Sequence, residues 1–169
     1  QWQDAGPYPG CDVTNNVGVL QSYATISSAV SGLPAILTGH SCVVIRNGAL
    51  YAEQVSVRNF TNNGSSITIL ADPASGVRPA VSPPAGSTAA FVIANASVNI
   101  QGIDVVPTNA MNWGVQSSSA LVTLSSVNVK DAGGLIKFAG VELSSWNAVS
   151  YTSVTVTAAH GFYLPGSTM

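Results

Sequence analysis

A degenerate eight-residue pattern of apolar and polar positions returns three times in the second half of the chain. Its copies have apolar residues at the first, third, sixth and eighth positions and read VNIQGIDV (98–105), VTLSSVNV (122–129) and VSYTSVTV (149–156). The copies start 24 and then 27 residues apart, and recurrence at this spacing is typical of a solenoid. Because the alternation within each half of the pattern has period two, each copy predicts two short strands that point apolar side chains inward and meet at a corner.

Weaker copies extend this register toward the N-terminus. CVVIRNG and SITILADP place Val43 and Ile67 in the first position, so the starts run 43, 67, 98, 122 and 149. The longest interval contains the Pro- and Gly-rich stretch 73–87, which predicts a loop that bulges from one turn. Further strands are predicted between the copies, around Val55, Val57, Phe91, Ile93, Val115, Val141 and Phe162. Two to three strands per turn indicate a parallel β-helix.

One helix is predicted ahead of this solenoid, over residues 23–34 (YATISSAVSGLP). Thr25 is the expected N-cap, and Gly32 with Pro34 ends the helix. Its apolar stripe consists of Ile26, Ala29, Val30 and Leu33. A β-helix has open ends that need cover, so we interpret the helix as an N-terminal cap. The expected organisation is an arm (1–22), a capping helix (23–34) and a single all-β parallel β-helix domain of about five to six turns (35–169).

The segment from residue 23 to residue 73 resembles a known family. YATISSAVSGLP, CVVIRNGALYAEQVSV and SITILADP are similar to the opening of the pectin methylesterase and pectate-lyase-like group of right-handed parallel β-helix proteins. The resemblance implies a right-handed single-stranded parallel β-helix. It does not extend to the catalytic phrases of the esterases, since strands similar to QAVAL, DFIFG and LGRPW do not occur in the sequence.

Lyases of this group hold calcium with clustered carboxylates, and a hard cation needs six or more oxygen ligands. The acidic candidates here are expected on four different turns and are Asp72, Asp104, Asp131 and Glu142. Asp104 and Asp131 are the pair that successive turns would bring closest, with Lys130 beside them. No GxSxG phrase marks a nucleophilic serine, and we expect His40 in a loop and His160 at a corner. No metal, cofactor or catalytic residue is therefore assigned.

Composition narrows the functional classes. Charged residues make up 7 % of the chain and hydrophobic residues 46 %, against about 25 % charged residues in an average domain. A net charge of −2 with five Lys and Arg residues argues against nucleic-acid binding, which needs clustered cations. No apolar run reaches the 18 or so residues of a membrane-spanning helix.

The two cysteines, Cys11 and Cys42, flank the predicted helix. We expect a disulfide that ties the arm to the first turn, with two buried thiols as the alternative. The polar start QWQDAGPYPG is typical of a mature end after signal removal, and equally of the boundary of an excised piece. We therefore expect a secreted or cell-surface protein.

Two sets of residues are candidates for surface chemistry. Asn59, Asn63 and Asn95 open sequons and would accept N-linked sugar if the source has that pathway, although chance is the better explanation of such triplets in an Asn- and Ser-rich chain. The aromatic residues of the last half would form either a glycan-binding row or a packing and self-association surface. They are Trp113, Phe138, Trp146, Tyr151 and Tyr163.

After HGFYL the sequence continues to PGSTM without a helix or polar turn that would cover the last coil. Either the chain is a fragment of a longer solenoid or its open end pairs with another molecule. We predict an extracellular structural or adhesive β-solenoid module, a subunit of a fibre or surface layer that associates end to end. The alternatives are a carbohydrate-active enzyme and a non-catalytic module that binds polysaccharide.

Overall fold

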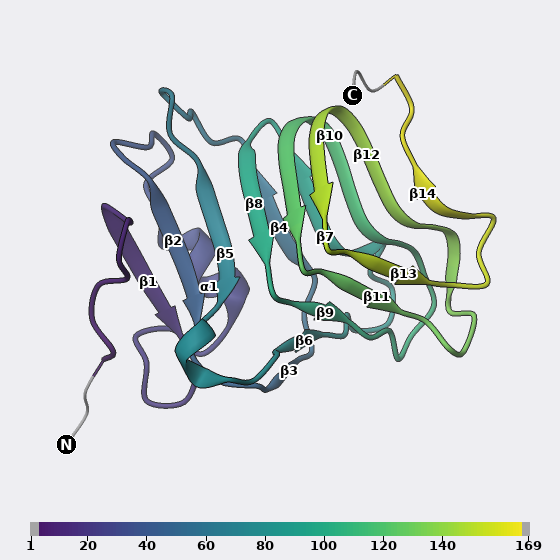
Figure 1. Ribbon diagram of the computed structural model, residues 1–169, viewed down its shortest axis with the longest axis horizontal. Coiled ribbons are helices and arrows are strands. Elements are labelled where there is room, and N and C mark those ends of the chain that lie inside the picture. Colours follow the sequence, from purple (N-terminus) through teal and green to yellow (C-terminus); the bar gives the residue numbers. More distant parts are fainter. Residues whose placement is uncertain (1–3, 167–169) are drawn as a thin grey trace.

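The structure is a computed structural model that describes residues 4–166. The chain winds into a parallel β-solenoid of about six turns with one short helix at its N-terminal end (Figure 1). The helices are α1 (Ile26–Ser31) and a 3₁₀ turn, η1 (Pro73–Ser75). The strands are β1 (Val13–Val17), β2 (Ser41–Ile45), β3 (Leu50–Tyr51), β4 (Val55–Arg58), β5 (Ile67–Ala71), β6 (Ala80–Val81), β7 (Ala89–Ala94), β8 (Ser97–Gln101), β9 (Asp104–Val105), β10 (Met111–Ser125), β11 (Asn128–Lys130), β12 (Ile136–Ser150), β13 (Ser153–Thr155) and β14 (His160–Tyr163).

Strands of successive turns stack in parallel on three faces. The first face comprises β1, β2, β5, β8 and the C-terminal halves of β10 and β12. The second comprises β4, β7, the N-terminal halves of β10 and β12, and β14. The third comprises β3, β6, β9, β11 and β13. The long strands β10 and β12 therefore cross a corner, where their register shifts between Ser117 and Ala120.

The interior is filled by columns of apolar side chains, one residue per turn. On the second face the aligned residues are Val55, Phe91, Val115, Val141 and Phe162. The first four are fully buried. The strands predicted around these five positions are thus confirmed, and each contributes an apolar side chain to one stack.

The first-face register agrees with the repeat in its middle and differs at both ends. Ile67, Val98 and Val122 align as predicted. However, Ile67 aligns with Ser41 rather than Val43, and Val122 aligns with Asn147 rather than Val149. Both differences equal two residues, which leaves the same side chains facing the core because side-chain direction alternates along a strand.

Residues with left-handed backbone turn the chain at the corners. Between the second and first faces these are Asn59 (φ 60°), Asn95 (φ 50°) and Ser119 (φ 48°). Asparagine tolerates this conformation better than most residues because its short polar side chain bonds locally. Asn95 also donates from Nδ2 to Oδ1 of Asn59 at 3.3 Å. The two asparagines therefore stack as a short ladder along this corner.

Helix α1 covers the N-terminal end of the coil. Thr25 is its N-cap, in a capping box with Ser28, and Gly32 is its C-cap. Its buried residues Ile26, Ala29 and Val30 belong to the main core. The helix has six residues, and no helix in the described part of the chain is long and apolar enough to cross a membrane.

The stretch 73–87 is only partly a loop, which corrects the prediction of one continuous bulge. It begins with η1, but β6 lies within it and pairs with β3 and β9 on the third face. Val81 in β6 is fully buried. The core needs an apolar side chain at this level of the third face, so the inserted residues leave the coil on either side of β6 rather than replace it.

Candidate functional site

The carboxylates considered for a metal site do not converge. Asp72 pairs with Arg46 at 2.8 Å between Oδ2 and Nη1. Asp131 is buried and accepts hydrogen bonds from two backbone amides four and five residues further along the chain. Asp104 lies in a separate ion-pair cluster. Among the described residues these groups serve local structure, and they form no shared cage of oxygen ligands for a hard cation.

Asp104 is the most heavily bonded of them. It receives Lys130 Nζ at 2.5 Å, Asn128 Nδ2 at 2.9 Å and Arg78 Nε at 3.0 Å. Burial would raise the pKa of Asp104, but these three hydrogen bonds and the Arg78 charge outweigh it and lower the pKa below its usual value of 3.8. A carboxylate that is ion-paired in this way and has a lowered pKa is a poor general base at neutral pH. The cluster is structural.

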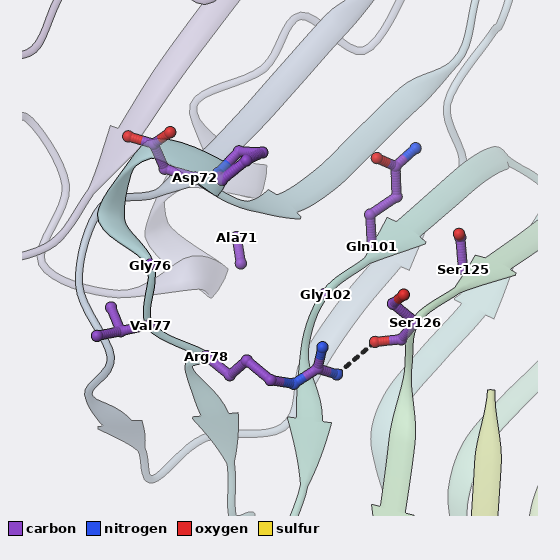
Figure 2. A pocket seen from close by; sticks show the side chains of 10 residues that line it. Ala71, Asp72, Gly76, Val77, Arg78, Gln101, Gly102, Ser125 and Ser126 are labelled. Carbon is purple, nitrogen blue, oxygen red and sulfur yellow. Dashed lines mark hydrogen bonds between the residues drawn. The ribbon is translucent and has the colours of Figure 1, made fainter. Parts of the chain in front are cut away.

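A shallow pocket of about 310 Å³ lies beside this cluster, where the first face turns into the third (Figure 2). Its lining includes Asp72, Arg78, Gln101 and Ser125. The guanidinium of Arg78 lies along the edge of the pocket, where it donates to the carbonyl of Ser126 and to Asp104. The lining thus offers one carboxylate, and the cation nearest the pocket is already paired. This arrangement lacks the convergent acid and base that sugar hydrolysis or elimination needs.

Three of the five predicted aromatic residues come together on the second face. Phe138 packs edge-on against Trp113 and Tyr163, with ring centroids 6.1 and 5.2 Å apart. His160 joins them, edge-on to Phe138 at 5.4 Å and stacked on Tyr163 at 5.0 Å. We call these four residues the aromatic cluster. Its rings are mostly perpendicular, so they pack on one another instead of lying side by side as a flat platform for sugar rings.

His160 was expected only as a polar corner residue. Its position in AAHGFYL corresponds to Trp113 in MNWGVQ, since each lies directly before a glycine at the start of a second-face strand. That correspondence is the sequence signal that identifies it as a ring of the cluster.

Trp146 and Tyr151 lie apart from the cluster. Trp146 is 66 % exposed on the first face and aligns with the exposed Leu121 of the preceding turn. Tyr151 is 89 % exposed at the next corner, in left-handed conformation with φ 48°. The five predicted aromatic residues therefore do not form one row.

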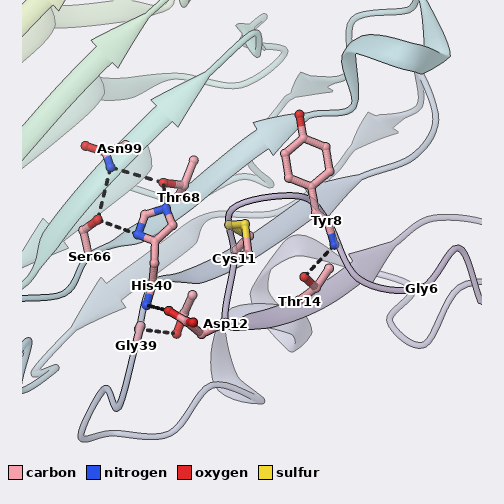
Figure 3. The surroundings of a disulfide bond; sticks show 12 residues. Gly6, Tyr8, Cys11, Asp12, Thr14, Gly39, His40, Ser66, Thr68 and Asn99 are labelled. Carbon is pink, nitrogen blue, oxygen red and sulfur yellow. Dashed lines mark hydrogen bonds between the residues drawn. A yellow bond between two sulfur atoms is a disulfide. The ribbon is translucent and has the colours of Figure 1, made fainter.

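The predicted disulfide joins Cys11 to Cys42 with a Cα–Cα distance of 5.9 Å (Figure 3). It ties the arm to β2, the first strand after the helix. The His40 ring lies nearby, and its ligand atoms and the two sulfurs fall within 4.8 Å of one another. Because the sulfurs are bonded to each other, neither is a thiolate that would coordinate a metal ion.

The His40 ring is also hydrogen-bonded on both nitrogens. Nδ1 contacts Ser66 Oγ at 2.9 Å and Nε2 contacts Thr68 Oγ1 at 3.1 Å, and Asn99 donates to both hydroxyls (Figure 3). The neighbouring Asp12 carboxylate accepts the backbone amide of His40, not its ring. A serine is thus within reach of an imidazole, but none of the described carboxylates orients that ring as a triad requires.

The three sequon asparagines are exposed, and all have left-handed backbone. Asn59 and Asn95 form the corner ladder, and Asn63 lies in a turn where it donates to the carbonyl of Leu37. Each therefore has a role in the fold that explains its presence. Sugar attachment stays a prediction.

The C-terminal turn presents an apolar opening. It comprises the C-terminal half of β12, β13 and β14, and their inward residues are Val149, Val154 and Phe162. Each stacks on a fully buried residue of the preceding turn, namely Leu124, Val129 and Val141. Yet Val149 and Phe162 are 40 % and 42 % exposed, and Val154 is half-buried. In the described part of the chain no further strand pairs with these outer edges.

Comparison with protein-family models, with curated proteins and with solved structures found no match. The solenoid agrees with the β-helix fold that the resemblance of residues 23–73 implies. What the protein does is therefore inferred from its own geometry.

Proposed function

We propose that the protein is an extracellular structural or adhesive β-solenoid module that associates with other copies through its C-terminal turn. The observation that carries the proposal is the opening formed by Val149, Val154 and Phe162, which leaves the end of the apolar interior accessible. Exposed strand edges next to apolar side chains are a template for pairing with another chain.

Two further observations support this class of function. The Cys11–Cys42 disulfide is typical of an oxidising, extracellular compartment. Three of the four acidic side chains considered for catalysis, Asp72, Asp104 and Asp131, are committed to ion pairs or to backbone amides, and the aromatic cluster lacks the coplanar rings that glycan binding would favour. A scaffold needs none of these groups to be available for chemistry.

The test is the mass of the protein in solution as a function of concentration. Size-exclusion chromatography coupled to light scattering should give a mass above the 17.2 kDa of one chain. Val149→Lys places a cation in the opening and should return the protein to a monomer, because a buried unpaired charge opposes association. Val77→Lys is the matched control, since Val77 is 46 % exposed in the segment between η1 and β6, away from both ends of the coil. Circular dichroism checks that both variants keep their strands.

A wild-type mass of one chain throughout the micromolar to millimolar range would overturn the proposed function. Equal loss of association in both variants would show that the contact lies elsewhere.

A further inference from the structure

The outer side of the first face carries two sulfurs and an imidazole beneath the N-terminal arm (Figure 3). Cys42 lies in β2 and is 1 % exposed, Cys11 packs against it from the arm, and His40 directly precedes β2. One ligand atom of each residue lies within 4.8 Å of those of the other two. Thiolate sulfur and imidazole nitrogen are the ligands that zinc prefers. What keeps this set from binding zinc is the bond between the two sulfurs.

The spacing of the ligand atoms fits a tetrahedral zinc ion once that bond is broken. Zn–S bonds of about 2.3 Å and a Zn–N bond of about 2.0 Å place the ligand atoms about 3.5–3.8 Å apart. A ring nitrogen of His40 is already within 4.8 Å of both sulfurs, so rotation of the two freed cysteine side chains covers the difference. Among the described residues no fourth side chain belongs to this group. Water would take the fourth position, as in zinc sites with three protein ligands.

Contacts other than the disulfide hold the three ligands in place. The backbone amides of Asp12 and Val13 donate to the carbonyl of His40 at 2.8 and 3.2 Å. The Asp12 carboxylate accepts the backbone amide of His40 at 2.7 Å. These bonds fix the residue next to Cys11 against His40, and the parallel ladders of β1, β2 and β5 fix Cys42. Reduction therefore frees two thiols without separating the segments that carry them.

The His40 ring also has the partner that a zinc-bound imidazole needs. Its two nitrogens contact the hydroxyls of Ser66 and Thr68. When one nitrogen binds the metal, the other donates its proton to the hydroxyl beside it, which fixes the tautomer and the orientation of the ring. Asn99 donates to both hydroxyl oxygens, at 3.3 and 3.2 Å, so either hydroxyl stays in position.

We propose that Cys11, His40 and Cys42 bind one Zn²⁺ ion when the disulfide is reduced, so that zinc and the disulfide are alternative ties between the arm and the first turn. A dithiol reductant breaks the S–S bond by giving two electrons to the sulfurs and is itself oxidised to a disulfide. The two thiols lose their protons to solvent, and the thiolates coordinate the metal. Oxidised glutathione reverses these steps and releases the ion. The inference is independent of the proposed self-association.

Zinc titration of the intact chain, oxidised and reduced, tests the site. The chain is reduced with dithiothreitol, freed of reductant and metal in the absence of oxygen, and titrated with Zn²⁺ against a chromophoric chelator. The reduced wild type should bind one ion per chain and the oxidised form none. His40→Ala should weaken binding by more than about 10-fold, since even the loss of a partner of a ligand costs about 10–100-fold. His160→Ala is the matched control, because His160 is the other histidine of the chain and lies in the aromatic cluster.

Two measurements on the wild type distinguish a folded site from thiols that bind metal in an unfolded chain. Zinc should raise the urea midpoint of the reduced protein, followed by circular dichroism, because the ion binds the folded state. Co²⁺ in place of zinc should give the intense visible absorption of a tetrahedral thiolate site. A reduced chain that binds no zinc, a urea midpoint that zinc leaves unchanged, or equal zinc affinity in His40→Ala would each overturn the proposal.

Discussion

Replacing Asp104 by Asn removes the negative charge that pairs with Arg78 and Lys130, while leaving one acceptor oxygen. The side chain of Asp104 is only 11 % exposed, but those of Arg78 and Lys130 are 40 % and 54 % exposed. A hydrogen bond to a charged group in a buried site is worth about 1.5–3 kcal/mol, and exposed ion pairs are worth about 1 kcal/mol or less. We therefore expect Asp104→Asn to lower the free energy of unfolding by about 2 kcal/mol at pH 7.

The effect should depend on pH in a defined direction. The pKa of Asp104 is lower in the folded protein than its ordinary value of 3.8. The charged carboxylate therefore contributes stability that is present above the unfolded-state pKa and is lost as pH falls through the folded-state pKa. The difference between wild type and variant should be full above about pH 5 and should shrink as the pH falls below 3.8 and through the lower folded-state pKa.

Urea unfolding followed by circular dichroism, repeated at steps between pH 7 and pH 2, measures this difference. Glu142→Gln is the control, because the Glu142 carboxylate makes no hydrogen bond to the residues that the structure describes. A difference for Asp104→Asn that stays constant across the pH range would refute the assignment of the stability to the charged form.

Three further outcomes are expected from unfolding measurements. Glu53→Ala should cost about 2 kcal/mol, since the Glu53 carboxylate accepts the amides of the first two residues of α1 at 2.8 and 2.9 Å; Glu53→Gln should cost about half as much. Changing Cys11 and Cys42 to Ser should lower stability by about 3–4 kcal/mol, because the disulfide closes a loop across 31 residues. Asn95→Ala should cost about 1 kcal/mol more than Asn95→Gly, because glycine accepts the left-handed corner; equal losses would contradict this account.

The sequence predicted the inward-facing side chains more accurately than the register of the strands. Val98 and Val122 align as expected, whereas Val43 and Val149 are each displaced by two residues. An alternating pattern is unchanged by a shift of two, so it reports which side of a strand faces the core and not where the strand begins. The positions of the corner residues determine where each strand begins. Residue type predicts these corners only weakly, because asparagine, serine and tyrosine all adopt left-handed backbone there.

Because the sequence pattern does not locate the corners, it also does not predict which surface aromatic residues come together. Trp113 and Phe138 meet because they lie at the starts of aligned second-face strands, and Trp146 is distant because the corner at Ser117–Ala120 places it on the first face. Nothing in the spacing of aromatic residues locates that corner. Glu53 was likewise missed as the cap of α1, since the pairing of a carboxylate with amides 26 and 27 residues away depends on how the first turn closes.

The helix and the disulfide at one end of the coil also give folding a direction. Each turn pairs only with its neighbours, so contacts form between segments one turn apart, and every completed turn is the template for the next. The first turns close against α1 and the Cys11–Cys42 bond, whereas among the residues that the structure describes the turn that ends with β14 pairs with a neighbouring turn on one side only. Backbone amides should therefore exchange with solvent slowly near the cap and progressively faster toward β14, so that the monomer unravels from its C-terminal turn.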